Sequence, residues 1–122
     1  MLDHIGFAVT DFAASRAFYT AVLAPLRIHV VREGDDWAMM GRDGLGQFWF
    51  GTYGTPPGRI HLAFTTPKHA EVRAFHKAAL KAGAKDNGAP GLRVEYDPDY
   101  YAAFVIDLNG HNIEAVCHTR EE

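Results

Sequence analysis

The sequence has a single cysteine, no long apolar run and no cluster of basic residues, and each shortage excludes a class of protein. One cysteine, Cys117, cannot form a disulfide within the chain, and its place in a predicted strand indicates a buried thiol. No apolar run approaches the ~20 residues that span a membrane. The opening residues MLDHIGFAV lack the basic start of a signal peptide. We therefore expect a cytoplasmic protein with no membrane partner.

The charged residues argue against nucleic acid as a partner. The 12 Lys and Arg residues are scattered and the net charge is −3, whereas nucleic-acid-binding domains concentrate basic residues on one face. The chain is instead rich in apolar side chains, with 48% hydrophobic and 12% aromatic residues. In 122 residues this composition predicts one folded domain with a substantial core.

The two halves of the chain resemble each other. Shifted by 57 positions, HIGFAVTDFAASRAFYTAVLAPL aligns with HLAFTTPKHAEVRAFHKAALKAG without a gap and with eight identities in 23 positions, among them His4 with His61. Such self-similarity indicates the duplication of a module. We expect one domain over residues 1–122, with a first module at 1–53, a second at 58–118 and the turn-forming GTPPG between them.

Each module is predicted to form a strand, a helix and then three strands, which is an α+β fold. Alternating apolar residues indicate the strands, and Asp11 and Thr66 are typical helix N-caps. The first module is expected to have strands at 3–9, 27–32, 37–42 and 47–52 and a helix from Asp11 to Ala24. The second is expected to have strands at 59–65, 92–96, 100–107 and 112–118 and a helix from Thr66 to Gly83.

Three polar side chains are predicted on the strand faces turned away from the helices. His4 and His61 hold equivalent places in the first strand of each module, and Glu114 interrupts the last strand. If the two sheets curl toward one another, the three side chains can converge. Two imidazoles and a carboxylate can hold a divalent first-row metal and leave positions open for water or substrate. A lone strand histidine is more often a core or surface residue, but the repeat favours a metal site.

Two further residues are candidates for contact with a substrate. Trp49, between Phe48 and Phe50, offers an aromatic wall, although ordinary core packing explains the two phenylalanines equally well. Arg93 can pair with a substrate carboxylate, although an exposed strand arginine is the more common case.

The segments DHIGFAVTDFAASRAFYTAVLAPL, HLAF and YYAAFVIDLNGHNIEAV resemble the vicinal oxygen chelate superfamily of glyoxalase I, bleomycin resistance proteins and extradiol dioxygenases. Within it, the chain is most similar to small glyoxalase-like bacterial proteins that end in D-x-x-G-x-N-I-E-A-V. The resemblance covers nearly the whole chain and implies two tandem βαβββ modules whose curled mixed sheets surround a concave site. It also implies a divalent transition metal (Fe, Mn, Ni or Zn) held by His4, His61 and Glu114.

One departure from the family pattern bears on the reaction. Glyoxalase I takes a fourth ligand, a glutamate, from the last strand of its first module, where this chain has Trp49, or Gln47 if the register slips by two residues. Glyoxalase I activity is therefore not expected. Extradiol dioxygenases use two histidines and one glutamate, with a further histidine and a tyrosine near the metal. Among the tyrosines Tyr96, Tyr100 and Tyr101 of this chain, Tyr101 is our candidate for contact with substrate.

Three functions remain open. The chain can be a metal-dependent lyase, isomerase or dioxygenase whose small substrate chelates the metal through neighbouring oxygens. It can be a binding protein of the bleomycin resistance type, which sequesters a flat ligand without catalysis. It can also be a regulatory or structural domain with a vestigial site. Because each module of ~60 residues leaves unpaired sheet edges and buries little surface by itself, we expect a homodimer.

Overall fold

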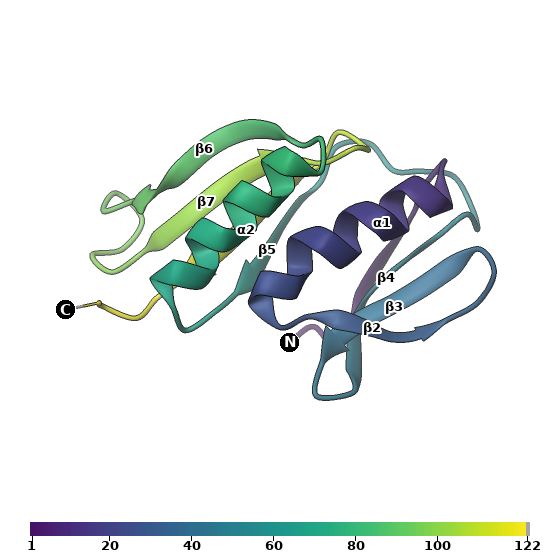
Figure 1. Ribbon diagram of the computed structural model, residues 1–122, viewed down its shortest axis with the longest axis horizontal. Coiled ribbons are helices and arrows are strands. Elements are labelled where there is room, and N and C mark those ends of the chain that lie inside the picture. The colour runs from purple at the N-terminus through teal and green to yellow at the C-terminus, as the bar shows by residue number, and fades with distance from the viewer. Residues whose placement is uncertain (122) are drawn as a thin grey trace.

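Two βαβββ modules lie side by side in the computed structural model, which describes residues 1–121 (Figure 1). Module 1 consists of β1 (Ile5–Ala8), α1 (Phe12–Leu23), a short 3₁₀ turn (Ala24–Leu26), β2 (His29–Glu33), β3 (Trp37–Arg42) and β4 (Leu45–Gly51). Module 2 consists of β5 (His61–Thr65), α2 (His69–Lys81), β6 (Lys85–Leu92), β7 (Tyr101–Ile106) and β8 (Asn112–Cys117). The α+β class and the duplicated module are confirmed.

Each module folds into one mixed four-stranded sheet, and the two sheets have the same topology. Sheet 1 has the order β1-β4-β3-β2 and sheet 2 the order β5-β8-β7-β6. The first strand of each module pairs in parallel with the last, and the other pairs are antiparallel. Gly6 lies opposite Trp49 in sheet 1, and Ala63 lies opposite Glu114 in sheet 2. Since Gly6 and Ala63 are equivalent in the repeat, Trp49 and Glu114 hold equivalent places.

The predicted cap of the first helix is confirmed. The Asp11 carboxylate accepts a hydrogen bond from the backbone N–H of Ala14 at 3.0 Å, which satisfies one of the free donors at the helix start. At the other end, Pro25 lies within the 3₁₀ turn that follows the helix, and Arg27 closes this turn with a positive φ of 61°.

The second helix begins later than predicted, at His69 instead of directly after Thr66. The Thr66 hydroxyl is still engaged at this end of the helix, because it donates to the Glu71 carboxylate at 2.5 Å. That hydrogen bond and the neighbouring Arg27 guanidinium lower the pKa of Glu71. The same carboxylate therefore joins the start of α2 to the end of α1 in the other module.

The strand predicted at 92–96 is wrong, because the structure places β6 at Lys85–Leu92, directly after α2. Gly88, Pro90 and Gly91 hide the alternating pattern of this strand in the sequence. Such residues are tolerated here because β6 is the edge of sheet 2 and its register with β7 shifts twice. The chain then turns, and the backbone N–H of Arg93 donates to the carbonyl oxygen of Tyr100 at 2.7 Å, just before β7.

The two modules share one apolar core, formed by the helices and by the sheet faces that the helices cover. Phe48 of β4 meets Phe64 of β5 edge to face at 5.4 Å between ring centroids. The Tyr19 hydroxyl of α1 donates to the buried carboxylate of Asp107, which also accepts two backbone N–H groups in the turn before β8. Because these covered faces meet each other, the uncovered face of each sheet, its outer face, is turned to solvent.

His111, directly before β8, is buried, with its ring 4.8 Å from that of Phe7 and its Nδ1 accepting from the backbone N–H of Ile60. In the part of the chain that the structure describes, neither helix is long and apolar enough to cross a membrane.

Candidate metal-binding site on the second sheet

The outer face of sheet 2 carries a buried carboxylate beside an accessible imidazole. Glu114 lies in β8 and His61 in the adjacent β5, and the His61 Nε2 is 2.8 Å from the Glu114 Oε1. The Glu114 side chain is only 1% exposed, whereas the His61 side chain is 54% exposed. Burying a carboxylate is unfavourable unless it is paired and hydrogen-bonded. The fold therefore holds Glu114 in place and leaves His61 accessible.

Tyr100 completes the surroundings of this carboxylate. Its hydroxyl donates to the Glu114 Oε2 at 2.5 Å, so that both carboxylate oxygens have a partner. Burial raises the pKa of Tyr100, and the hydrogen bond to Glu114 and the charge of Glu114 raise it further. The phenol thus stays protonated and remains a donor. The rings of Tyr96 and His118 pack edge-on against that of Tyr100, each at 5.1 Å.

The third predicted ligand, His4, is not part of this cluster. It lies just before β1, with its Nδ1 2.8 Å from the Asp3 Oδ1 and its side chain 60% exposed. Among residues 1–121, no three side chains of His, Cys, Asp or Glu come together in a way that could hold a metal ion. One chain therefore brings together two of the three predicted ligands.

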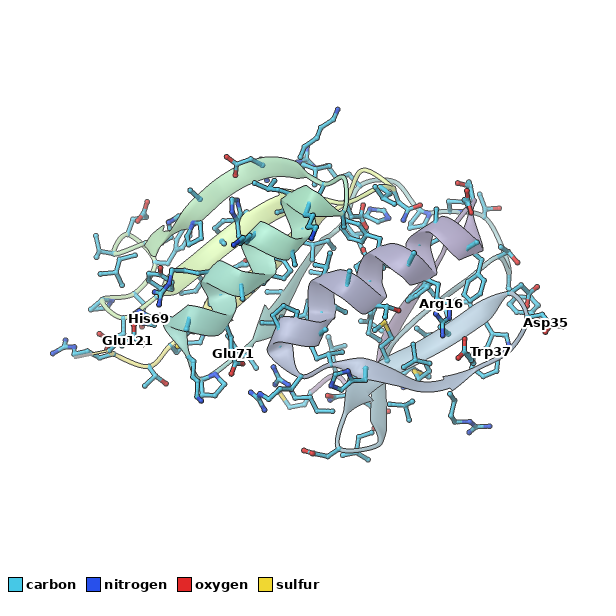
Figure 2. The ribbon with its side chains drawn as sticks, in the orientation of Figure 1. Arg16, Asp35, Trp37, His69, Glu71 and Glu121 are labelled. Carbon is cyan, nitrogen blue, oxygen red and sulfur yellow. The ribbon has the colours of Figure 1, made fainter. Side chains whose placement is uncertain are left out.

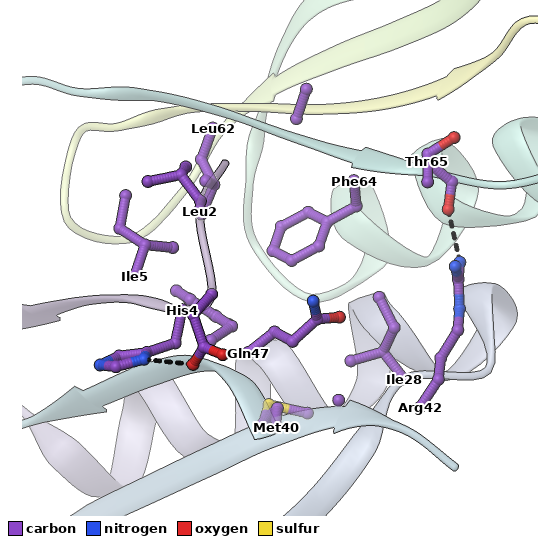
Figure 3. Close-up of a pocket in the computed structure, with 14 residues that line it drawn as sticks. Leu2, His4, Ile5, Ile28, Met40, Arg42, Gln47, Leu62, Phe64 and Thr65 are labelled. Carbon is purple, nitrogen blue, oxygen red and sulfur yellow. Dashed lines mark hydrogen bonds and ion pairs between the residues drawn. The ribbon is translucent and has the colours of Figure 1, made fainter. Parts of the chain in front are cut away.

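His4 lies at a cavity of about 220 Å³ between the modules, where sheet 1 faces β5 (Figure 3). The wall is mainly apolar, with Ile5, Met40 and Phe64 among its residues. Arg42 closes one side, because its guanidinium donates to the carbonyl oxygen of Leu26 at 2.8 Å and to that of Thr65 at 2.5 Å. Neither His61 nor Glu114 lines this cavity, so it is separate from the paired side chains.

The register of sheet 1 decides which residue stands where glyoxalase I has its fourth ligand. Trp49 pairs with Gly6 as Glu114 pairs with Ala63, so the place belongs to Trp49 and not to Gln47. The Trp49 indole stacks on the Tyr53 ring at 6.3 Å between centroids. Trp49 helps to line a second pocket of about 320 Å³ on the outer face, whereas Phe48 and Phe50 are turned into the core.

Arg93 lies on the outer face of sheet 2, close to the paired side chains. Its guanidinium is 5.4 Å from the centre of the Phe104 ring, and Phe104 lies 6.2 Å from His61 between ring centroids. Its Nη2 donates to the carbonyl oxygen of Ala89 at 2.7 Å, which fixes the side chain. Arg93 and His61 thus both lie beside the Phe104 ring.

Tyr101 points to the opposite face of sheet 2. Its ring stacks on that of His69 in α2 at 3.9 Å, and its hydroxyl accepts from Arg73 at 3.4 Å. Figure 2 shows His69 at the start of α2, beside Glu121. Tyr100, which sequence reasoning passed over, is the tyrosine that reaches Glu114. Strand alternation could have identified it, because Tyr100 is four residues from Phe104, the residue directly opposite Glu114.

The tandem βαβββ modules and the polar cluster on sheet 2 define the class of protein to which this chain can be compared. The chain belongs to the Glyoxalase/Bleomycin resistance protein/Dioxygenase superfamily, whose family model matches residues 1–115. None of the curated proteins compared with the chain matches it.

Solved structures of this superfamily have the same fold. A glyoxalase/bleomycin resistance protein from Albidiferax ferrireducens T118 is 26% identical, with a TM-score of 0.82 over 93% of this chain and 96% of that one. A glyoxalase/bleomycin resistance protein/dioxygenase family enzyme from Burkholderia phytofirmans PsJN is 17% identical, with a TM-score of 0.71 over 94% and 96% of the two chains. A domain of the same description from Frankia sp. EAN1pec is 22% identical, with a TM-score of 0.66 over 96% of each chain.

Proposed function

We propose that this chain is a metal-dependent enzyme, a lyase, isomerase or dioxygenase, whose small substrate chelates a divalent ion through neighbouring oxygens. The observation that carries the proposal is the buried Glu114 carboxylate beside the accessible His61 imidazole. A carboxylate that served only as a surface charge would gain nothing from 1% exposure, whereas a metal ligand must be held in one orientation. A cytoplasmic location stays a prediction from the sequence.

One chain brings together only part of the donor set that a divalent transition ion needs. His61 and Glu114 supply a borderline nitrogen and a hard oxygen, which suit Fe, Mn, Ni or Zn. Within residues 1–121 no third ligand joins this cluster, while His4 is exposed on the other module. We propose that the chain is a homodimer in which His4 of one copy meets His61 and Glu114 of the other. The outer faces, which are turned to solvent in one chain, would then face each other.

The residues of the site have separable tasks in this proposal. A bound ion would polarise the adjacent oxygens of the substrate. Tyr100 keeps its proton and fixes the Glu114 carboxylate, and Arg93 is placed to pair with an anionic part of the substrate near His61. Trp49 provides an apolar surface on the facing sheet. Tyr100, and not the predicted substrate contact Tyr101, is the tyrosine of this site, because it is the one in contact with Glu114.

A second candidate function is sequestration of a flat ligand without catalysis, as in bleomycin resistance proteins. The observation that favours it is the aromatic pocket of about 320 Å³ on sheet 1, which Trp37, Trp49 and Tyr53 line. This function needs the pocket but does not need His61 or Glu114. The two proposals therefore differ in what the metal-ligand variants should do.

The test is the metal content of the purified protein after loading, in turn, with iron(II), manganese, nickel and zinc and removal of the excess. We expect about one ion per chain for the wild type and a large loss for His61→Ala and Glu114→Gln. His29→Ala and Glu95→Gln are the matched controls, because both residues are exposed and lie outside the cluster. The controls should retain the wild-type content.

Full metal content in both His61→Ala and Glu114→Gln would contradict the metal proposal. If the wild type holds no ion but still binds flat ligands, the sequestration function is correct. Light scattering at tens of micromolar tests the assembly separately, because a monomer would leave His4 without the other two ligands. Screening chelating metabolites by thermal shift, with and without the retained metal, then identifies the substrate class.

A further inference from the structure

The outer face of sheet 1 carries a row of paired residues across all four strands, with side chains from β4, β3 and β2. The register places Gly6 of β1 opposite Trp49 of β4, Trp49 opposite Met39 of β3, and Met39 opposite Arg32 of β2. The register of β2 with β3 shifts at a bulge between Val30 and Arg32, so that Val30 lies opposite Met40 and Arg32 opposite Met39. A bulge of this kind redirects a side chain to the other face of a sheet. The row therefore ends in a cation on the outer face.

Two indole rings lie flat on this face because glycines leave room for them. A Cβ atom at Gly6 would lie 2.7 Å from the Trp49 Cε3, closer than real contacts allow. At Gly51 a Cβ atom would lie 2.8 Å from the Trp37 Cβ and 2.9 Å from the Trp49 Cζ2. At Gly34 it would lie 2.2 Å from the Trp37 Nε1. The glycines thus allow the two indoles to form an aromatic floor, which we call the indole floor (Trp37 and Trp49).

The pocket over the indole floor has about 320 Å³, enough for one or two fused rings. Tyr53, stacked on Trp49, and Met39 form its other walls. Aromatic faces of this kind bind flat rings by offset stacking and by removal of apolar surface from water. The shape of the pocket therefore selects a planar ligand.

The charges around the indole floor are uneven. Arg32 lines the pocket and is exposed, and its side chain makes no hydrogen bond or ion pair within the described residues 1–121, whereas its neighbour Glu33 is paired with Arg16 at 2.7 Å. At the β2–β3 turn, close to Trp37, lies the acidic Asp35 (Figure 2), and the charge of Asp36 raises the pKa of Tyr53. An anion on the ligand is thus attracted by Arg32 and repelled at the Tyr53 side.

We propose that the indole floor binds the ring of a planar aromatic anion whose carboxylate pairs with Arg32. The inference names the substrate class of the proposed function and rests on that function for its link to catalysis. The link is that His4, the predicted third metal ligand, lies two residues before Gly6, and Gly6 is the residue opposite Trp49 in the sheet. A guanidinium accepts a carboxylate in a bidentate pair, so that the ring is fixed in orientation as well as in place.

The chain offers a local readout, because it has only two tryptophans. The indole N–H signals of Trp37 and Trp49 are followed by nuclear magnetic resonance in metal-free protein, after assignment with Trp37→Phe and Trp49→Phe. The probes are 2-naphthoate, its neutral analogue 2-naphthamide, and cyclohexanecarboxylate. We expect 2-naphthoate to shift both signals to saturation, 2-naphthamide to bind about tenfold more weakly, and the non-aromatic acid to bind more weakly still.

Variants assign the interactions. Arg32→Gln should weaken 2-naphthoate about tenfold and leave 2-naphthamide unchanged. Lys77→Gln on the exposed face of α2 removes the same charge and should change neither probe. Gly6→Ala should displace the Trp49 ring and weaken both probes, while the unshifted signals of the second module report that the protein is still folded.

Two results would overturn the inference. One is the absence of any shift of the indole signals by 2-naphthoate up to millimolar concentration. The other is equal affinity for 2-naphthoate and 2-naphthamide, with no effect of Arg32→Gln. That result would show that the pocket does not select an anionic ligand. The experiment uses metal-free protein, so its result does not depend on metal binding. If the protein binds no metal, the aromatic pocket can still bind 2-naphthoate. If 2-naphthoate does not bind, the proposed metal site is unaffected.

Discussion

Replacing Tyr100 by phenylalanine removes one hydroxyl from the surroundings of the buried carboxylate and leaves the ring in place. The Glu114 Oε2 then loses its 2.5 Å donor while the side chain remains 1% exposed. A hydrogen bond to a charged group contributes about 1.5–3 kcal/mol. Because Tyr100 is only half-buried, water can replace part of the lost bond, and we expect the lower end of that range.

The loss should appear as weaker metal binding. A cost of about 1.5 kcal/mol corresponds to roughly tenfold in affinity, which agrees with the 10–100-fold that the loss of a residue hydrogen-bonded to a ligand typically causes. The assay is a competition titration of zinc or nickel against a chelating dye, with the unfolding midpoint measured in parallel. Tyr96→Phe is the matched control, because Tyr96 packs on Tyr100, is 65% exposed, and makes no hydrogen bond through its hydroxyl within residues 1–121.

An unchanged affinity in Tyr100→Phe would show that metal binding by Glu114 does not depend on the Tyr100 hydroxyl. Equal losses in the two tyrosine variants would also refute this role of Tyr100, because the effect would then come from general loosening of the turn before β7. The expected pattern is a loss of affinity in Tyr100→Phe alone.

Three further predictions concern pH, stability and reaction. The pKa of Tyr19 is raised, mainly by burial and then by Asp107, so the folded state keeps a proton that the unfolded chain releases above pH ~10. The free energy of unfolding should therefore be insensitive to this group below pH ~10 and fall as pH rises from there toward the raised value; urea unfolding of Tyr19→Phe should show a shallower fall. Asp107→Ala should destabilise the chain by about 3 kcal/mol in urea unfolding, because a buried hydroxyl and two backbone N–H groups lose their acceptor; a change below about 1 kcal/mol would contradict this role. Conversion of the methylglyoxal–glutathione adduct should be negligible with every metal, because Trp49 stands where a carboxylate base is needed and such a base contributes about 10²–10⁴-fold; robust turnover in a coupled assay would show that another residue supplies the base.

Much of the fold could be predicted because the repeat and the local patterns agree. The identities between the modules predicted the duplicated unit, and the Asp11 cap predicted where α1 begins. Strand alternation placed Glu114 on the face opposite to Ile113 and Ala115, which is also the face of His61 in the structure. The cap and the strand faces are predicted from residues within a few positions, and the duplication from the similarity of two segments 57 positions apart.

The features that could not be predicted depend on long-range contacts or on irregular backbone. Strand β6 was missed because an edge strand tolerates Pro90 and the glycines that usually mark a loop. Arg32 reaches the outer face only through a bulge, which no sequence period reveals. The separation of His4 from Glu114 follows from the way in which the covered faces of the two sheets meet, and that packing is not encoded in either strand alone.

The most direct test of the shared metal site is complementation between two variants that each lack one proposed ligand. His4→Ala and His61→Ala are given different affinity tags and co-expressed, and the heterodimer is isolated through both tags. In a two-fold dimer that shares its sites, one site of the heterodimer combines the intact His4 of one chain with the intact His61 and Glu114 of the other. We expect little metal in either parent and about one ion per heterodimer, against about two in the wild-type dimer. A heterodimer that holds no more metal than its parents would show that the two chains do not share a metal site.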